Sequence, residues 1–357
     1  MTRAGGLPLR WRTRFYKRPI SSLRTMVLSV VFVALNSMLL GVPSFGELGP
    51  ARWLLLPNAS CRYIANAPTN CWYYNLQEGL TSGWESAYLV VLPMVLVAGL
   101  MSIGLGRGWC GWACPLGFAQ HMISRLRARL GIQYQELPYW AVAILDHLKY
   151  AILFVMVLVA VAIGVPALGL TVWGDELALP YCQVCPGKPV FTVLQQGLGI
   201  EPFATSLPWI AVAMLVVFLV ASFGVRMFWC RVCPIGAFMA LFNRQALFWL
   251  RKVPAKCTKC RVCLRVCPMD IEEIFVEMDR ENVTSPECIM CGRCVESCPE
   301  EGCLSLCYMG VELARSRSPA TRRDELEGRL ECPPHLEGEG GSDAGPVDGP
   351  APEEVET

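Results

Sequence analysis

The chain has 357 residues, of which 54% are hydrophobic and only 17% are charged. Soluble globular proteins usually carry about 25% charged residues, so this composition argues against that class and favours a membrane protein. The net charge of +1 points to no particular partner, and the sequence contains no recognisable nucleic-acid module. Most of the 19 cysteines lie in short runs followed by proline. In a chain this long and apolar, they indicate metal ligation rather than a disulfide scaffold.

Four apolar stretches predict helices that cross a membrane, because each approaches the roughly 17–25 residues that span a hydrocarbon core. They cover residues 26–42, 86–105, 147–165 and 208–225. Helices are favoured because lipid offers the backbone no hydrogen-bond partners. The alternative is a set of buried helices in a large soluble protein, which four stretches with so few charges argue against.

Lys and Arg residues gather before the first stretch, between the second and third, and after the fourth. Because basic loops stay on the cytoplasmic side, both termini are expected there, in a bacterial-type inner membrane. The basic N-terminal segment is long and no small-residue cleavage site follows residues 26–42. It is therefore interpreted as preceding a permanent anchor rather than as part of a cleaved signal peptide.

Two cysteine runs near the C-terminal side have the spacing of a bacterial two-cluster ferredoxin, and each ends in Cys-Pro. In such runs the fourth cysteine binds the other cluster. One predicted [4Fe–4S] cluster is held by Cys257, Cys260, Cys263 and Cys298, and the other by Cys288, Cys291, Cys294 and Cys267. Thiolates are the soft, anionic ligands that iron–sulfur clusters take. Two structural zinc sites are the alternative, and two complete runs with both prolines argue against it.

Two further cysteine pairs lie at the predicted cytoplasmic ends of the second and fourth stretches. They are Cys110 with Cys114 and Cys230 with Cys233, and both follow Trp and end in Cys-Pro. The match indicates an internal repeat whose two halves bring four thiols together. A third cluster or another metal is the preferred interpretation. Reduced thiols with interfacial tryptophans, or a redox-active dithiol, are the alternatives.

Two membrane Cys-Pro motifs followed by a two-cluster ferredoxin resemble the NapH/NosR type of polyferredoxin-like membrane protein. The resemblance covers roughly residues 20–300 and implies a membrane quinol dehydrogenase or electron-transfer subunit. Both motifs have three residues between the cysteines in that family. Cys110 and Cys114 match this spacing, whereas Cys230 and Cys233 have two residues between them.

The predicted outer loops carry a second foursome: Cys61, Cys71, Cys182 and Cys185. Outward-facing loops permit disulfides, so one or two disulfides are one interpretation. The other is an outward-facing cluster or metal, because Cys182 and Cys185 also end in Cys-Pro. Redox centres on both faces of the membrane would allow the chain to conduct electrons across it. Because the membrane core is about 30 Å thick, a quinone or another subunit would then be needed between them.

Asp146 and His147 open the third apolar stretch and are candidate proton acceptors for a quinone site, because ionisable groups at membrane depth are often functional. An ordinary interfacial boundary with snorkelling side chains is the alternative. The roles of Cys303, Cys307 and Cys332 are left open. The acidic tail, rich in Gly and Pro, is predicted to be disordered.

The sequence therefore predicts an α-helical membrane protein, a four-helix transmembrane bundle, with a small α+β ferredoxin-like module holding two [4Fe–4S] clusters. The predicted parts are a basic segment (1–25), the membrane domain (26–250), the ferredoxin-like module (251–312) and the acidic tail (313–357). One or two additional iron–sulfur clusters are expected, with quinone as a candidate substrate.

The predicted function is electron transfer between the quinone pool or a cytoplasmic donor and a partner redox protein, within a larger respiratory complex. The expected partners are other redox subunits, quinone or quinol, and the lipid bilayer. Whether the chain is itself an enzyme is left open. The alternative function is a maturation or regulatory factor that supplies electrons for metal-cofactor assembly, such as copper reduction. A purely structural anchor fits the ferredoxin runs poorly.

Overall fold

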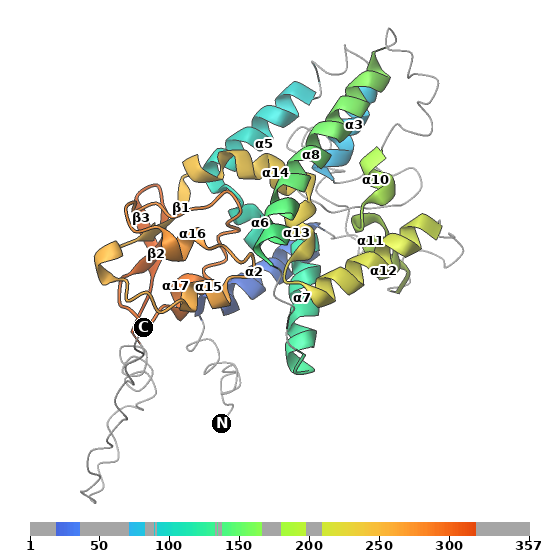
Figure 1. Cartoon of the computed structure of the whole chain (residues 1–357). Helices are drawn as coiled ribbons and strands as arrows, with labels where there is room; N and C mark the ends of the chain where they lie inside the picture. Colours follow the sequence, from blue (N-terminus) through green and yellow to red (C-terminus); the bar gives the residue numbers. More distant parts are fainter. Residues whose placement is uncertain are drawn as a thin grey trace, which may run out of the picture. The chain divides into compact units, whose positions relative to one another are not determined.

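The computed structural model describes most of the chain up to Ser318 (Figure 1). The described residues are 19–35, 71–82, 89, 91–132, 134, 138–165, 180–197 and 209–318. They belong to the first of two units into which the chain divides, Met1–Ser318, and the second unit lies outside them. The predicted disordered tail and the domain boundaries therefore stay predictions.

Four apolar helices coincide with the four predicted membrane stretches: α2 (Pro19–Leu35), α5 (Leu92–Leu105), α8 (Tyr139–Gly164) and α12 (Trp209–Gly224). Among the described residues, only the segment Trp140–Gly164 is both long and apolar enough to cross a membrane. At 1.5 Å per residue, a helix of this length extends about 38 Å. The other three are shorter, and residues adjoining each of them lie outside the described part. The fold is helix-rich, and the four-span bundle stays a prediction.

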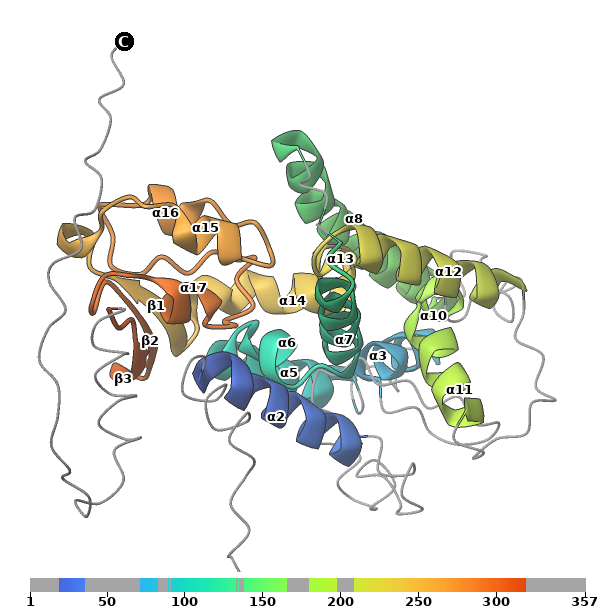
Figure 2. The same cartoon turned by 90° about the horizontal axis from the view of Figure 1, so that it is seen from below.

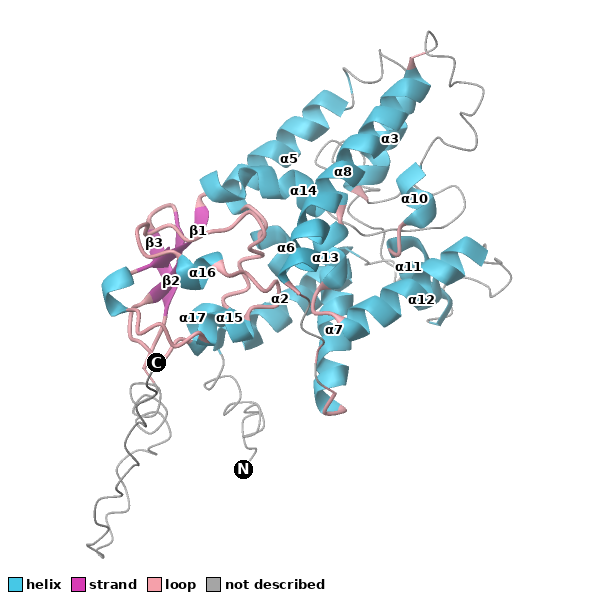
Figure 3. Cartoon of the chain, in the orientation of Figure 1, coloured by secondary structure: helices cyan, strands magenta, loops and turns pink. Residues whose placement is uncertain are grey.

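Short helices connect and flank the apolar ones (Figure 3). They are α3 (Trp72–Thr81), α6 (Gly108–Trp112), α7 (Pro115–Arg129), α10 (Pro180–Val184), α11 (Gly187–Gly197), α13 (Phe228–Val232) and α14 (Pro234–Phe242). Helices α7 and α14 begin at the proline of a Cys-Pro pair, where a missing N–H costs nothing because the first turn leaves it unpaired. Cys114 and Cys233 precede these helices in extended conformation. The Cys-Pro motifs therefore place a thiol at the start of each helix.

The C-terminal part is a small α+β module built on a three-stranded antiparallel sheet. Its strands, in the order β1-β2-β3, are β1 (Phe248–Lys252), β2 (Leu304–Tyr308) and β3 (Val311–Arg315). Phe248 pairs with Tyr308, and the β2–β3 register shifts between Leu306 and Cys307. The module also contains α15 (Val262–Val266), α16 (Glu273–Val276), α17 (Arg293–Ser297) and the 3-10 turns η7 (Asn243–Gln245) and η8 (Pro254–Lys256). The predicted ferredoxin-like module is thus present.

Helix α2 joins the module to the cysteine-bearing helices, and Figure 2 shows it beside α6 and α7. The backbone N–H of Ser21 donates to Glu296 of α17 at 3.1 Å, and the Ser21 hydroxyl donates to the same carboxylate. The buried Arg24 donates to the carbonyl of Gly111 in α6 at 2.6 Å. Polar groups of α2 therefore contact both parts, and Ser21 and Arg24 lie in the segment 1–25 that the sequence analysis described only as basic.

Candidate metal centres

The eight ferredoxin cysteines line two separate pockets in the module. The first, here called the Cys288 pocket, contains about 340 Å³ of atom-free space, open solvent included, and is lined by Cys267, Cys288, Cys291 and Cys294. The second, the Cys257 pocket, contains about 350 Å³ and is lined by Cys257, Cys260, Cys263 and Cys298. The fourth cysteine of each run thus lies with the first three of the other run. This is the grouping that the spacing predicts for two clusters.

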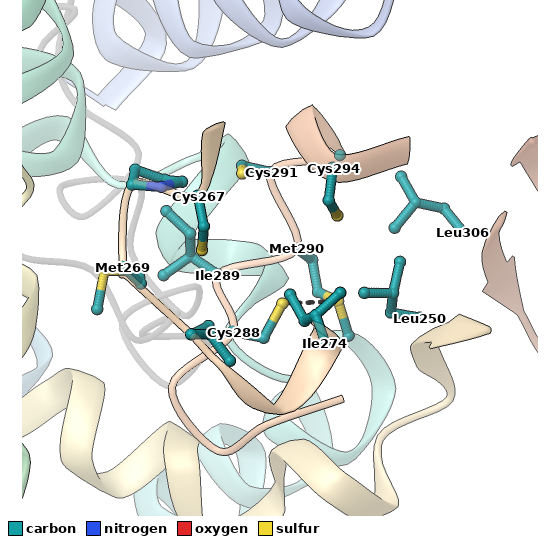
Figure 4. Close-up of a pocket in the computed structure, with 13 residues that line it drawn as sticks. Leu250, Cys267, Met269, Ile274, Cys288, Ile289, Met290, Cys291, Cys294 and Leu306 are labelled. Carbon is teal, nitrogen blue, oxygen red and sulfur yellow. Dashed lines mark hydrogen bonds between the residues drawn. The ribbon is translucent and has the colours of Figure 1, made fainter. Parts of the chain in front are cut away.

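The lining of the Cys288 pocket is apolar and sulfur-rich. Figure 4 shows its cysteines on one side, with Leu250 and Leu306 on the side opposite Cys267. All four cysteines are buried, whereas Cys260 of the Cys257 pocket is exposed. The Cys257 pocket therefore lies nearer the surface. Cys303, whose role the sequence left open, also lines the Cys257 pocket.

Both loops bend at equivalent positions through left-handed backbone conformations. Lys259 and Met290 follow the first cysteine of their runs by two residues and have φ of 55° and 50°. Arg261 and Gly292 directly follow the second cysteine and have φ of 58° and 70°. A left-handed non-glycine residue costs roughly 1–2 kcal/mol. Successive N–H groups in such turns form concave anion sites, so the strain is consistent with loops shaped around an anionic cluster.

The residues in the two pockets fit a cluster better than a single ion. A tetrahedral zinc with Zn–S bonds of about 2.3 Å needs thiolates within roughly 4 Å of one another. Among the described residues, no three His, Cys, Asp or Glu side chains meet closely enough to hold one metal ion. A four-iron cubane holds its thiolates farther apart, one on each iron. Two zinc sites, the alternative reading of these runs, therefore lack support.

The four Cys-Pro thiols, here called the Cys110 set, come together from two parts of the chain. Cys110 lies in α6 and Cys230 in α13, while Cys114 and Cys233 precede α7 and α14. The thiol of Cys114 lies close enough to the other three for their charges to interact. Burial raises the pKa of Cys230 to about 11 and that of Cys233 to about 12. Thiolates here therefore need a nearby cation, which a metal centre would supply.

The internal repeat is visible in the packing of two glycines. Gly117 follows Cys114-Pro115, and a Cβ on it would lie 3.0 Å from the carbonyl oxygen of Cys110. Gly236 follows Cys233-Pro234, and a Cβ on it would lie 3.6 Å from the carbonyl oxygen of Cys230. Gly117 thus lets the Cys110 carbonyl approach α7 closely, whereas the contact of Gly236 with the Cys230 carbonyl has ordinary van der Waals length and its nearest atom is Arg107 Nη2 at 3.2 Å. Both halves place the carbonyl of the first cysteine beside the same glycine position, despite their different cysteine spacing.

Three of the four cysteines expected in the outer loops are described by the structure. Cys61 is outside the described residues, and Cys71, Cys182 and Cys185 are half-buried. The thiol of Cys185 lies within electrostatic reach of Cys71, Cys182 and also Cys233. The expectation that a membrane thickness separates these three thiols from the Cys110 set is therefore wrong. The reason is that α3 and α10 fold inwards, with Trp72 and Tyr73 completely buried.

The structure separates the two residues predicted for a quinone site. His147 is exposed, with Nδ1 2.7 Å from the carbonyl oxygen of Ala143 in its own helix. Asp146 is half-buried, and within the described part of the chain its Oδ1 has no hydrogen-bond partner. The carboxylate of Glu287 lies within electrostatic reach of Asp146. Only Asp146 faces the module.

Sequence reasoning missed a buried ion triad beside this position. Glu287, which precedes Cys288, accepts from Arg107 at 2.6 Å and also pairs with Lys149 of α8. Both cations are fully buried. Burial alone would raise the pKa of Glu287, but Arg107 and Lys149 outweigh it, so the pKa is lowered. The triad ties the Cys288 loop to the helices. The only feature of the sequence that could have indicated this triad is the presence of the basic residues Arg107 and Lys149 near the ends of apolar stretches.

His121 of α7 is a buried histidine whose protonation opposes folding. Burial first, then Arg24 and Arg125, lowers its pKa to about 3, against about 6.5 in an unfolded chain. Below pH 6.5 the unfolded state therefore binds a proton that the native state excludes. Stability should fall as pH drops from 6.5 towards 3, by at most about 1.4 kcal/mol per pH unit from this group.

The measurement is the thermal unfolding midpoint between pH 7 and pH 5. We expect His121→Gln to flatten the decline, whereas His147→Gln, at an exposed position, should leave it unchanged. An equally steep decline in His121→Gln would contradict the assignment.

Family profiles match the parts of the chain that carry these cysteines. The profile described as "4Fe-4S dicluster domain" matches residues 250–299, which include both ferredoxin runs. The profile described as "4Fe-4S binding domain" matches twice, at residues 86–133 and 206–256. The two matches contain the two Cys-Pro motifs of the Cys110 set, in agreement with the internal repeat. The fold and the profiles together define a helix-rich protein with a 4Fe–4S dicluster module.

Relatives with similar sequences extend over most of the chain. An uncharacterized protein of Methanocaldococcus jannaschii is 30% identical over 244 residues, 67% of this chain and 86% of the relative. The ferredoxin-type protein NapH of Escherichia coli is 26% identical over 271 residues, 74% of this chain and 82% of NapH. The regulatory protein NosR of Pseudomonas aeruginosa is 30% identical over 199 residues, 53% of this chain but 23% of NosR. No solved structure matches.

The chain belongs to the NapH/NosR type of ferredoxin-like proteins. The resemblance read from the cysteine motifs is thereby confirmed.

Proposed function

We propose that the chain is a membrane-bound electron-transfer protein in which iron–sulfur clusters pass electrons between the ferredoxin module and the membrane helices. The observation that carries the proposal is that the Cys288 pocket and the Cys110 set share one apolar cluster. Cys230 belongs to that cluster, and Cys110 packs against it. Among the relatives, NapH is named as a ferredoxin-type protein, and a second Escherichia coli protein is named as a putative electron transport protein.

The contact between α6 and the Cys288 loop supports a route through this cluster. Trp112 of α6 donates from Nε1 to the carbonyl of Met290 at 2.8 Å. A Cβ on Gly111 would overlap the carbonyl oxygen of Ile289, so the helix backbone lies directly on the loop. Only glycine permits so close an approach. Cys110, next to Gly111, is thus held against the loop that carries Cys288 and Cys291.

The order of the centres follows from their exposure. The exposed Cys260 places the Cys257 pocket where a partner redox protein can approach. The buried Cys288 pocket comes next, and the Cys110 set follows it among the helices. When bound, the clusters supply one-electron redox chemistry. The protein buries the Cys288 pocket and holds the successive cysteine sets close to one another. This arrangement serves electron transfer in either direction.

Exposed apolar side chains support the membrane location. Leu100 of α5, Phe154 of α8 and Val220 of α12 are 69%, 68% and 67% exposed. Large exposed apolar patches mark surfaces that contact lipid or protein. In this proposal the four apolar helices, completed by the adjoining apolar residues, span the membrane with both termini in the cytoplasm. Quinol is the proposed donor or acceptor, with Asp146 as a proton acceptor at the start of α8.

The test is iron and acid-labile sulfide content together with quinol-dependent cluster reduction, on anaerobically purified full-length protein. We expect about four irons per pocket and reduction of the clusters by a quinol at a catalytic rate. As ligand variants, Cys267→Ser should remove the cluster of the Cys288 run, and Cys298→Ser that of the Cys257 run.

Each result bears on a different part of the proposal. Iron-free protein would overturn the cluster assignment. Loaded clusters that quinol reduces only slowly would favour the alternative, a factor that supplies electrons for metal-cofactor assembly. Loss of the Cys257-run cluster in Cys267→Ser would contradict the exchange of the fourth ligands.

A further inference from the structure

Three cysteines lie in the segments that fold inwards between the apolar helices, outside the residues matched by the family profiles. Cys71 precedes α3, Cys182 lies in α10, and Cys185 lies between α10 and α11. Cys71 and Cys185 pack against the same apolar cluster as Cys110 and Cys233. The three thiols, here called the Cys71 set, are therefore continuous with the Cys110 set.

Polar donors surround these three sulfur atoms. The backbone N–H groups of Tyr73 and Tyr74, in the first turn of α3, lie near the Cys71 thiol. Cys185 Sγ accepts from the N–H of Gly187, the first residue of α11, at 3.4 Å. Gln77 Nε2 lies 3.8 Å from Cys182 Sγ. Hydrogen bonds to the sulfur atoms are a recurrent feature of iron–sulfur sites.

Buried donors without partners lie at the same place. Tyr73, Tyr181 and Trp72 are 0%, 6% and 0% exposed, and within the described part of the chain Tyr73 Oη, Tyr181 Oη and Trp72 Nε1 have no hydrogen-bond partner. A buried polar group left unpaired costs about 1–3 kcal/mol. All three groups belong to the apolar cluster against which Cys71 and Cys185 pack, and they indicate an acceptor that the described protein atoms do not provide.

The two tyrosines lie close to the thiols. The Tyr73 hydroxyl is within electrostatic reach of Cys71 and Cys182, and that of Tyr181 is within reach of Cys71 and Cys185. Their rings meet edge to face with centroids 5.1 Å apart. Both hydroxyls also interact with Cys233. The unpaired donors are thus gathered between the Cys71 set and the nearest thiol of the Cys110 set.

Cys185 repeats the local structure of the two membrane Cys-Pro motifs. In each case a proline follows the cysteine, and a helix begins at that proline or one residue after it. A glycine near the start of the helix lies beside the thiol: Gly117 beside Cys114, Gly236 beside Cys233, and Gly187 beside Cys185, where the N–H donates to Sγ at 3.4 Å. Because this sequence pattern recurs, the chemistry proposed for the first two cysteines extends to Cys185.

We propose that Cys71, Cys182 and Cys185 hold a further iron–sulfur cluster, whose sulfides accept hydrogen bonds from Tyr73 and Tyr181. The inference rests on the proposed function and extends its route from the Cys110 set to a further centre beside Cys233. Three thiolates hold three irons of a cubane, and the fourth iron takes a ligand outside this set. A single soft ion does not fit, because the described thiols do not converge closely enough.

The experiment compares three variants of the full-length, anaerobically purified protein. Cys182→Ser/Cys185→Ser should lose about four irons and four sulfides and one EPR signal, with the ferredoxin signals retained. Cys307→Ser, at a buried cysteine of β2 away from both pockets, should keep the full content. Tyr181→Phe should keep all iron but lower the midpoint potential of that one signal, because it removes a hydrogen bond to sulfur.

The outcomes separate this inference from the proposed function. Unchanged iron in the double variant, zinc or copper instead of iron at the set, or a disulfide between these cysteines would overturn the further cluster alone. Wild-type protein without ferredoxin signals would overturn the proposed function. If the double variant does not accumulate, Tyr181→Phe decides, because an unshifted potential overturns the inference.

Discussion

Replacing Arg107 with alanine is expected to destabilise the protein by about 3–5 kcal/mol, the loss typical when one partner of a buried ion pair is removed. Arg107 is fully buried, and its guanidinium donates to Glu287 at 2.6 Å and to the Cys230 carbonyl at 2.7 Å. Without it, Glu287 keeps only Lys149 as a charged partner. The measurement is the free energy of unfolding in detergent solution, followed by circular dichroism.

The matched control is Arg251→Ala. Arg251 pairs with Glu281 at 3.0 Å, but the two side chains are 45% and 63% exposed, and exposed pairs contribute about 0–1 kcal/mol. Equal losses in the two variants would show that the buried triad does not hold the module. Glu287→Gln should also destabilise strongly, because it removes the carboxylate that pairs with two buried cations.

Gly111→Ala is expected to separate the Cys288 loop from α6. The added methyl group would overlap the carbonyl oxygen of Ile289, which is backbone and cannot rotate away. Overpacking of this kind typically costs about 1–3 kcal/mol. The shift should also weaken the bond from Trp112 to Met290. We therefore expect a lower thermal midpoint and slower electron transfer from the ferredoxin clusters to the Cys110 set, measured by stopped-flow absorbance.

Gly104→Ala provides the matched control, because a Cβ at this position in α5 would meet no atom within 4 Å. Alanine is favoured over glycine in a helix by about 1 kcal/mol, so this variant should be unchanged or slightly more stable. Wild-type electron-transfer rates in Gly111→Ala would contradict the route through α6.

The pairing of the ferredoxin cysteines could be predicted from sequence because it depends on local spacing. Thiolates with two residues between them lie on one tight loop whatever surrounds it, and the exchange of the fourth cysteine follows from the two-run pattern. The grouping of Cys267 with Cys288 and of Cys298 with Cys257 in the two pockets agrees with this. The apolar stretches were likewise visible, since hydropathy is a property of consecutive residues.

The position of the Cys71 set could not be predicted, because it depends on contacts between distant segments. Loop composition placed residues 71–82 and 180–197 outside the membrane, yet Trp72 and Tyr73 are completely buried, with α3 packed on α8. The separation of Asp146 from His147 has a similar cause. Neighbouring residues on a helix point in different directions, and only the packing of Glu287 against α8 decides which one faces inwards.

The sequence by itself thus determined the chemistry: which cysteines form runs, which ligand type they offer, and how the two ferredoxin runs exchange their fourth members. The spatial order of the candidate metal centres could be learned only from the tertiary structure. Gly111 on Ile289, the triad of Arg107, Lys149 and Glu287, and the inward fold of α3 bring the thiols together. The physical reason is that thiolate spacing is local, whereas burial of charge and close backbone approach require residues far apart in the chain.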